Sequence, residues 1–287
     1  MDDTSTHEEW SDAQETTTVE VDDHELRVAY YEAGTDHDEP PVVFLHGIPT
    51  WSFLWRGVAS AVAESRHVVA PDLVGYGNST MRDGFDRSIR AQEAMLESLL
   101  DELNVDSVTL VGHDIGGGVA LRYATHNPDA VDRLVLSNAV CYDSWPVEFV
   151  ASLGVPKNAE KMDDDELEAQ LDGAFEDGLY EDDPDPAFVE GMKAPWLGDG
   201  GKTALSRAAV STNTNHTTEL DYDAIAAETL LLWGGDDQFQ PVSYAERLAD
   251  DVDSTEFVEL DRAYHWVTED RPDVYRDELQ TFLDGTE

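Results

Sequence analysis

The sequence predicts an α/β fold in which a mostly parallel sheet is covered by helices and a helical cap is inserted after the sixth core strand. Short, β-branched apolar runs alternate with helix-like stretches, as expected for strands that are buried on both faces. The alternation stops between residues 142 and 220, where acidic, helix-leaning sequence dominates. We therefore assign residues 15–141 and 221–287 to the core and residues 142–220 to the cap.

The first part of the chain is predicted to hold a disordered segment followed by a hairpin. Residues 1–14 are acidic and polar without a repeating pattern, so we expect a disordered acidic lead-in. Residues 16–21 and 25–31 are alternating, β-branched or aromatic runs separated by a polar turn at residues 22–24, which is typical of an antiparallel hairpin. The continuous apolar run at residues 41–45 predicts a strand that is covered on both faces.

The remaining elements follow from two repeating patterns. Strand-like apolar runs occur at residues 68–70, 108–111, 134–136, 230–233 and 255–260. Helix-like sequence occurs at residues 88–103, 163–175 and 272–283. Because strands and helices alternate in the core, we expect helices to connect consecutive parallel strands.

The most informative stretch joins one of these strands to a helix. It reads Leu-Val-Gly-His-Asp-Ile-Gly-Gly-Gly over residues 110–118, so that small residues surround one carboxylate, Asp114. A strand that turns sharply into a helix brings two backbones together, and glycine is needed where a Cβ would clash. Such a turn projects its central side chain over the sheet edge, among backbone N–H groups of a helix N-terminus. The pattern is that of a nucleophile elbow with aspartate for serine, although by itself it also fits an aspartate that only caps the helix.

Two further polar groups follow later strands. Asp237 comes after the strand at residues 230–233, and His265 comes after the strand at residues 255–260. Because parallel strands end at the same edge of a sheet, we expect both side chains to lie near Asp114. The chain order nucleophile, acid, histidine is that of a catalytic triad built around such an elbow. We therefore predict that Asp114, Asp237 and His265 are catalytic.

Neighbouring polar residues have simpler interpretations. Asp236 is an alternative to Asp237 as the acid, and Asn138, at the end of its strand, is predicted to be structural. His216 is too isolated to indicate a metal site, and no glycine-rich nucleotide-binding pattern follows a strand. We expect neither a metal nor a cofactor.

The composition bears on location and redox environment. No apolar run reaches the ~18 residues needed to span a bilayer, and the first residues lack a basic and apolar leader. Cys141 is the only cysteine, so an intrachain disulfide is impossible. These features predict a soluble, cytoplasmic protein with no membrane partner.

The charge is extreme. Asp and Glu number 63 against 17 Lys and Arg, which gives a formal net charge of −46. Such self-repulsion destabilises a compact fold at low ionic strength, whereas the Debye length shrinks to ~3 Å in molar salt. The composition therefore predicts a protein from a salt-adapted organism, and it makes nucleic acid an unfavourable partner.

Together these motifs resemble the α/β-hydrolases that use an aspartate nucleophile, namely the haloalkane dehalogenases and the soluble epoxide hydrolases. The resemblance rests on Gly-His-Asp-Ile-Gly-Gly at residues 112–117, on His-Gly-Ile-Pro-Thr at residues 46–50 with Leu-Trp-Arg at residues 54–56, and on residues 72–79. It extends from about residue 21 to residue 283 and is weakest in the cap. It implies an α/β-hydrolase fold. The motif at residues 46–56, in the loop after the strand at residues 41–45, favours the dehalogenases, and this loop is called the first loop below.

The resemblance also implies groups that stabilise a leaving group. In the family a tryptophan directly after the nucleophile holds the halide or oxyanion, but this chain has Ile115 there, and Ile48 in the first loop. The backbone N–H groups of Ile48 and Ile115 are still expected to form an oxyanion hole. The remaining substrate and leaving-group candidates are the indoles and phenols of Trp51, Tyr142, Trp145, Tyr180 and Trp196.

The sequence thus predicts a hydrolase that acts with water on a small apolar organic substrate. Asp114 is expected to form an alkyl–enzyme ester, which a water activated by His265 then hydrolyses. A haloalkane dehalogenase-like activity is the main interpretation, and epoxide hydrolysis is the alternative. An esterase or a binding protein on the same fold has less support, because a binder needs no catalytic triad.

Overall fold

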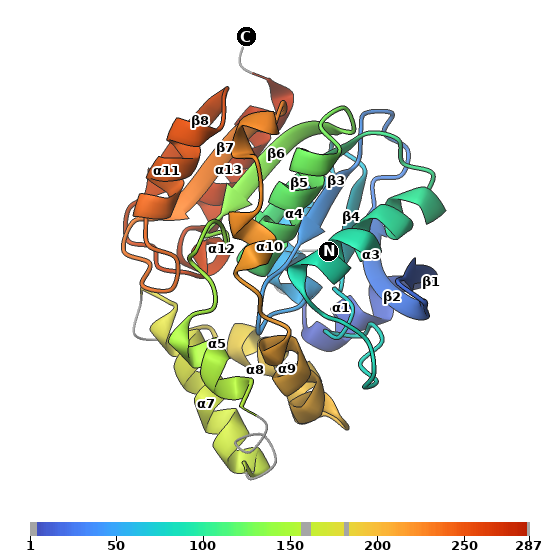
Figure 1. Ribbon diagram of the computed structural model, residues 1–287, viewed down its shortest axis with the longest axis vertical. Coiled ribbons are helices and arrows are strands. Elements are labelled where there is room, and N and C mark those ends of the chain that lie inside the picture. The colour runs from blue at the N-terminus through green and yellow to red at the C-terminus, as the bar shows by residue number, and fades with distance from the viewer. Residues whose placement is uncertain (1–4, 156–161, 181–183, 286–287) are drawn as a thin grey trace.

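The sheet of this protein is mostly parallel, as predicted. The computed structural model of the chain describes residues 5–155, 162–180 and 184–285, and within them eight strands form one sheet in the order β1-β2-β4-β3-β5-β6-β7-β8. The pairs β1–β2 and β2–β4 are antiparallel, and all other neighbours are parallel. Figure 1 shows the twisted sheet with helices on its faces.

Each predicted strand corresponds to an observed one. The strands are β1 (Gln14–Val21), β2 (His24–Ala33), β3 (Val42–Leu45), β4 (Val68–Pro71), β5 (Val108–His113), β6 (Val131–Ser137), β7 (Glu228–Gly234) and β8 (Thr255–Leu260). β3, β4 and β5 are buried along their whole length, which explains their continuous apolar sequence. β6 begins three residues before the predicted run, because Asp132 and Arg133 near its start are not fully buried and so leave no apolar pattern there.

Helices cover the sheet on both faces and supply the connections between parallel strands. The core helices are α2 (Arg56–Val62), α3 (Ile89–Glu102), α4 (Ile115–His126), α11 (Ser243–Asp251), α12 (Val267–Asp270) and α13 (Pro272–Asp284), with short 3₁₀ turns η1 (Ser52–Trp55) and η2 (Tyr222–Ala224). α3 packs against α4, and α2 packs against α13. None of the described helices is long and apolar enough to cross a membrane.

The inserted region between β6 and β7 is helical. It contains α5 (Glu148–Leu153), α7 (Asp164–Asp177), α8 (Pro186–Leu197), α9 (Gly201–Val210) and α10 (Asn215–Thr218). In Figure 1, α5, α7, α8 and α9 form a group beyond one edge of the sheet. α10 instead packs against α4, so the chain has already returned to the core there. The four grouped helices and the described residues between them are called the cap below.

The segment before β1 differs from the prediction. α1 (His7–Ala13) begins at a capping box, in which the Thr6 hydroxyl accepts from the Glu9 N–H and the Glu9 carboxylate accepts from the Thr6 N–H. The side chain of Trp10 is fully buried in the core. The prediction of a disordered lead-in at residues 1–14 is therefore wrong for the described part of that segment, because a capped helix with a buried indole outweighs the acidic composition. The first four residues lie outside the described residues.

Candidate active site at the strand ends

Asp114 lies at a strained turn between β5 and α4. Its backbone has φ 52° and ψ −122°, a conformation that a residue with a side chain rarely adopts. The flanking glycines are required by close backbone contacts: a Cβ on Gly116 would lie 2.2 Å from the Leu45 carbonyl oxygen, and a Cβ on Gly112 would lie 2.7 Å from the Gly116 oxygen. The turn has the geometry predicted for an elbow.

The Asp114 carboxylate is buried but not isolated. The backbone N–H of Ile48 donates to Asp114 Oδ1 at 2.8 Å, and the N–H of Ile115 also donates to this carboxylate. Burial raises the pKa of Asp114 to about 6, while His265 and the two N–H groups act in the opposite direction. The two backbone N–H groups predicted from the sequence, those of Ile48 and Ile115, thus both donate to the Asp114 carboxylate.

His265 lies between two carboxylates. Its Nδ1 lies 2.8 Å from Asp237 Oδ2, and its Nε2 lies 3.8 Å from Asp114 Oδ2. A carboxylate accepts hydrogen bonds, so Nδ1 carries the proton and Nε2 of the neutral ring keeps a lone pair that faces Asp114. Burial by itself lowers the pKa of His265, but the charge and hydrogen bond of Asp237, with the charge of Asp114, outweigh burial and raise the pKa.

Asp237 is the carboxylate that orients the imidazole. The Phe239 N–H donates to Asp237 Oδ1 at 2.7 Å, and the Asn138 amide donates to Oδ2 at 2.6 Å. Asn138 also accepts from the Gly234 N–H at 3.2 Å, which anchors it to β7. Asp236, the alternative acid, is exposed to solvent. Asn138 is therefore structural, as predicted, and the structure that it stabilises is the Asp237 carboxylate.

A pocket opens onto Asp114 and His265. It contains about 300 Å³ of empty space, part of which is open to solvent. The core supplies Ile48 and Trp266 to its wall, and the cap supplies Phe149 and Val150 of α5 and Ala174 of α7. Trp145 and Val147, just before α5, complete this side of the wall. Apart from Asp114 and His265 the lining side chains are apolar. The site therefore combines one carboxylate and one imidazole with an apolar enclosure.

The comparisons with known proteins agree with this architecture. A family model described as the alpha/beta hydrolase fold matches residues 40–181. The uncharacterized protein Rv2715 of Mycobacterium tuberculosis is 31% identical over 280 residues, which cover 92% of this chain and 80% of that protein. The chain belongs to the α/β-hydrolase fold family.

Two further relatives of this α/β-hydrolase have names that state an activity. Haloalkane dehalogenase 2 of Mycobacterium tuberculosis is 27% identical over 260 residues, covering 86% of this chain and 88% of the relative. The cis-3-alkyl-4-alkyloxetan-2-one decarboxylase of Shewanella oneidensis is 42% identical over 101 residues, covering 34% of this chain and 32% of the relative.

The three tryptophans proposed to face the leaving group occupy different positions in this α/β-hydrolase. Trp145 lines the pocket, and its indole N–H has no hydrogen-bond partner among the described residues. The Trp51 indole donates to the Gly191 carbonyl at 2.9 Å, and the Trp196 indole donates to the Pro49 carbonyl at 2.5 Å. Trp51 and Trp196 are therefore not leaving-group residues, because each already uses its single donor to join the cap to the first loop.

Neither predicted tyrosine belongs to the pocket of the α/β-hydrolase. The Tyr142 hydroxyl donates to Asp251 Oδ2 at 2.8 Å, and its ring packs 4.2 Å from that of Tyr222. Tyr180 packs against Tyr264, with 5.4 Å between ring centroids. Neither side chain therefore lines the pocket that opens onto Asp114 and His265.

The wall residues missed by the sequence analysis include the two aromatic side chains beside His265. The Phe239 ring lies 5.3 Å from the His265 ring, and the Trp266 ring lies 4.5 Å from it, so both aromatics enclose the imidazole. Each immediately neighbours a predicted catalytic motif, and that adjacency was the available signal. Among the described residues no group of three or more His, Cys, Asp and Glu is arranged to hold a metal ion.

Proposed function

We propose that this α/β-hydrolase converts small alkyl halides to alcohols through an ester on Asp114. The observation that carries the proposal is the placement of the Asp114 carboxylate, with Oδ1 held by the Ile48 N–H and Oδ2 facing His265 Nε2. A serine nucleophile needs a base to become reactive, whereas an aspartate is already a nucleophile when ionised. The triad therefore supports chemistry at a saturated carbon rather than acyl transfer.

In the first step Asp114 Oδ2 attacks the carbon that bears the halogen. The new O–C bond forms as the carbon–halogen bond breaks, and the halide leaves with the bonding pair. The Trp145 indole is the side-chain donor proposed to bind the departing halide, because it lines the pocket with its N–H available. The product of this step is a neutral alkyl ester on Asp114.

In the second step water hydrolyses the ester. His265 Nε2 takes a proton from the water, and the resulting hydroxide adds to the Asp114 carbonyl carbon. The negative charge develops on Oδ1, which already accepts from the Ile48 N–H, and the Ile115 N–H, which donates to the same carboxyl group, is the second donor proposed to stabilise it. Collapse of this intermediate expels the alkoxide, which takes the proton from His265 and leaves as the alcohol. The carboxyl group left on Asp114 then releases the second proton of the water to solvent, which regenerates the carboxylate and balances the halide released in the first step.

The electrostatics support the order of the two steps. In the resting site the Asp114 charge is one of the causes that raise the pKa of His265. Esterification neutralises Asp114, so the pKa of His265 falls as soon as the ester has formed. The imidazole consequently becomes available as a base when the second step requires one.

A trapping experiment tests the proposal. His265→Gln removes the base but leaves Asp114 intact, so exposure to 1-bromobutane should add one butyl group to the protein, on a peptide that contains Asp114. The wild-type protein should release butan-1-ol, measured by gas chromatography so that chloride in the buffer does not interfere. Asp114→Asn is the control and should show neither the adduct nor the alcohol. An adduct on another peptide would contradict Asp114 as the nucleophile, and normal turnover by His265→Gln would contradict His265 as the base.

The relative from Shewanella oneidensis favours a second candidate activity, on oxetan-2-ones. Attack of Asp114 at the saturated ring carbon would break its bond to the ring oxygen and leave a carboxylate on the same molecule. Loss of CO₂ would then convert the C–C bonding pair into a C=C bond and expel the Asp114 carboxylate. This route uses no water.

Product analysis separates these activities. Alkene from a cis-3,4-dialkyloxetan-2-one should form in both the wild type and His265→Gln, because no base is needed. Butan-1-ol from 1-bromobutane should form only in the wild type. A diol from 1,2-epoxybutane, without release of alcohol from any bromoalkane, would replace the dehalogenase assignment with epoxide hydrolysis.

A further inference from the structure

The loop that carries His265 is held by the cap through its backbone. The N–H groups of His265 and Trp266 both donate to the carbonyl of Gly178, at 2.9 and 3.0 Å. Gly178 is the C-cap residue of α7, directly after the last helical residue, Asp177. One carbonyl of the cap thus accepts from two consecutive residues of the histidine loop.

Asp270 makes a second connection between the same two segments. Its Oδ1 accepts from the Tyr180 N–H at 2.9 Å, and its Oδ2 accepts from the Tyr264 N–H at 2.8 Å. Three consecutive N–H groups, those of residues 264–266, are therefore satisfied by Asp270 or by the cap. A loop whose donors are satisfied in this way changes conformation only if the cap segment moves with it.

The contact is too close to admit a side chain at residue 178. A Cβ on Gly178 would lie 2.3 Å from Trp266 Nε1, although the backbone φ of −88° is ordinary for any residue. Glycine is therefore required by proximity rather than by backbone conformation. Gly173 provides a contrast: it lies in α7, which Gly178 caps, and a Cβ there would meet nothing within 4 Å.

We propose that the segment Gly178–Tyr180 of the cap is a positioning element for His265. By holding the imidazole in place, this segment sets the rate of ester hydrolysis but not the rate of ester formation. The inference rests on the proposed function. Asp114 is held by Ile48 and Ile115, neither of which belongs to the cap, so the position of the nucleophile in the alkylation step does not depend on this contact. Hydrolysis does depend on it, because His265 Nε2 must stay beside Asp114 while Nδ1 stays bonded to Asp237.

A matched pair of glycine variants tests the inference. With 1-bromobutane, Gly178→Ala should still give a burst of bromide at close to the wild-type rate, followed by turnover that is slower on the order of 10- to 100-fold. The butyl adduct on Asp114 should accumulate in the steady state, as seen by intact mass. Gly173→Ala should match the wild type in both phases. Equal loss of both phases in Gly178→Ala, or unchanged turnover, would overturn the inference.

A variant that adds no volume guards against misfolding. Asp270→Asn replaces one acceptor oxygen by an N–H donor opposite a backbone N–H, so it disturbs the same connection without overpacking. It should also accumulate the adduct. If Gly178→Ala fails to fold and Asp270→Asn turns over without accumulation, the inference is wrong.

A titration that needs no substrate separates this inference from the proposed function. The imidazole of His265, followed by nuclear magnetic resonance, should titrate at a lower pH in Gly178→Ala than in the wild type, because displacement from Asp237 and Asp114 removes the interactions that raise its pKa. Gly173→Ala should titrate as the wild type does. An adduct in His265→Gln together with an unshifted titration in Gly178→Ala would reject the inference alone, whereas no adduct in His265→Gln would reject the proposed function.

Discussion

Asp114 has to be ionised to react, yet the fold opposes its ionisation. Its side chain lies in a buried, mostly apolar pocket, and burial raises its pKa from 3.8 to about 6. The native state therefore holds the Asp114 proton more tightly than the unfolded chain does. The contribution of this group to stability is fully present below about pH 4 and is lost as the pH rises through about 6.

Removing the charge of Asp114 should consequently stabilise the protein above neutral pH. Asp114→Asn has nearly the same shape, and its amide oxygen can still accept from the Ile48 N–H. A pKa difference of this size corresponds to about 3 kcal/mol, so the variant should unfold several degrees higher at pH 8. At pH 4, where the native carboxyl is protonated, the two thermal midpoints should converge. A variant that is less stable than the wild type at pH 8 contradicts the assigned direction.

At the scale of single residues, the sequence predicted positions that the backbone geometry restricts to glycine. It did not predict which acceptor each tryptophan indole binds. The position of Asp114 at a sharp turn could be predicted, because close backbone contacts require glycine at residues 112 and 116. Trp145 and Trp196 look alike in the sequence, since both are tryptophans of an acidic helical stretch. Only the path of the first loop places the Pro49 carbonyl where it occupies the Trp196 donor. Such pairings join residues far apart in the chain and leave no local pattern.

At the scale of elements, α1 shows how a short motif can outweigh composition. Its Thr-x-x-Glu capping box stood in the sequence, but the acidic residues around it suggested disorder. The helix is held to the core by Trp10, whose indole donates to Ser52 Oγ at 3.0 Å and whose ring stacks 4.3 Å from that of Tyr31. α1 also contacts α8 of the cap. A strand needs only its own pattern to be recognised, whereas this helix depends on a distant partner.

Truncation of Trp10 should therefore destabilise the whole protein. Trp10→Ala leaves a large cavity in a fully buried site and should lower the free energy of unfolding by about 3–5 kcal/mol. Asp12 lies in the same helix at an exposed position, so Asp12→Ala should change the free energy of unfolding by less than about 0.5 kcal/mol. Urea unfolding at constant KCl measures both. Equal midpoints for the two variants would mean that α1 contributes nothing to stability.

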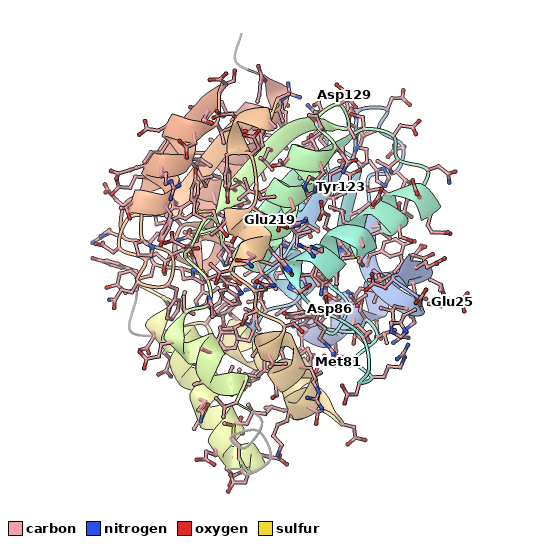
Figure 2. All side chains as sticks on the ribbon, in the orientation of Figure 1. Glu25, Met81, Asp86, Tyr123, Asp129 and Glu219 are labelled. Atoms are coloured by element: carbon pink, nitrogen blue, oxygen red, sulfur yellow. The ribbon has the colours of Figure 1, made fainter. Side chains whose placement is uncertain are left out.

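At the scale of the whole molecule, the fold must hold a large excess of carboxylates on one compact surface. The formal net charge is −46, and the acidic side chains come from every part of the chain. Figure 2 labels four of them, Glu25, Asp86, Asp129 and Glu219, which come from different parts of the chain and are all exposed. Composition predicted this charge fully, because it depends on the number of residues and not on their arrangement. What it predicts about stability is a separate claim.

That claim is that salt stabilises the native state. The Debye length falls from ~10 Å at 0.1 M to ~3 Å at 1 M, so repulsion between surface carboxylates is largely screened within that range. Salting-out ions also strengthen apolar burial, and this effect keeps increasing with concentration. We expect the thermal midpoint to rise steeply up to a few hundred millimolar KCl and more slowly up to 2 M, with potassium sulfate at equal ionic strength matching KCl in the first phase and exceeding it in the second. A midpoint that is flat or falls between 0.1 M and 2 M KCl would refute the salt adaptation and leave the Asp114, Asp237 and His265 site unaffected.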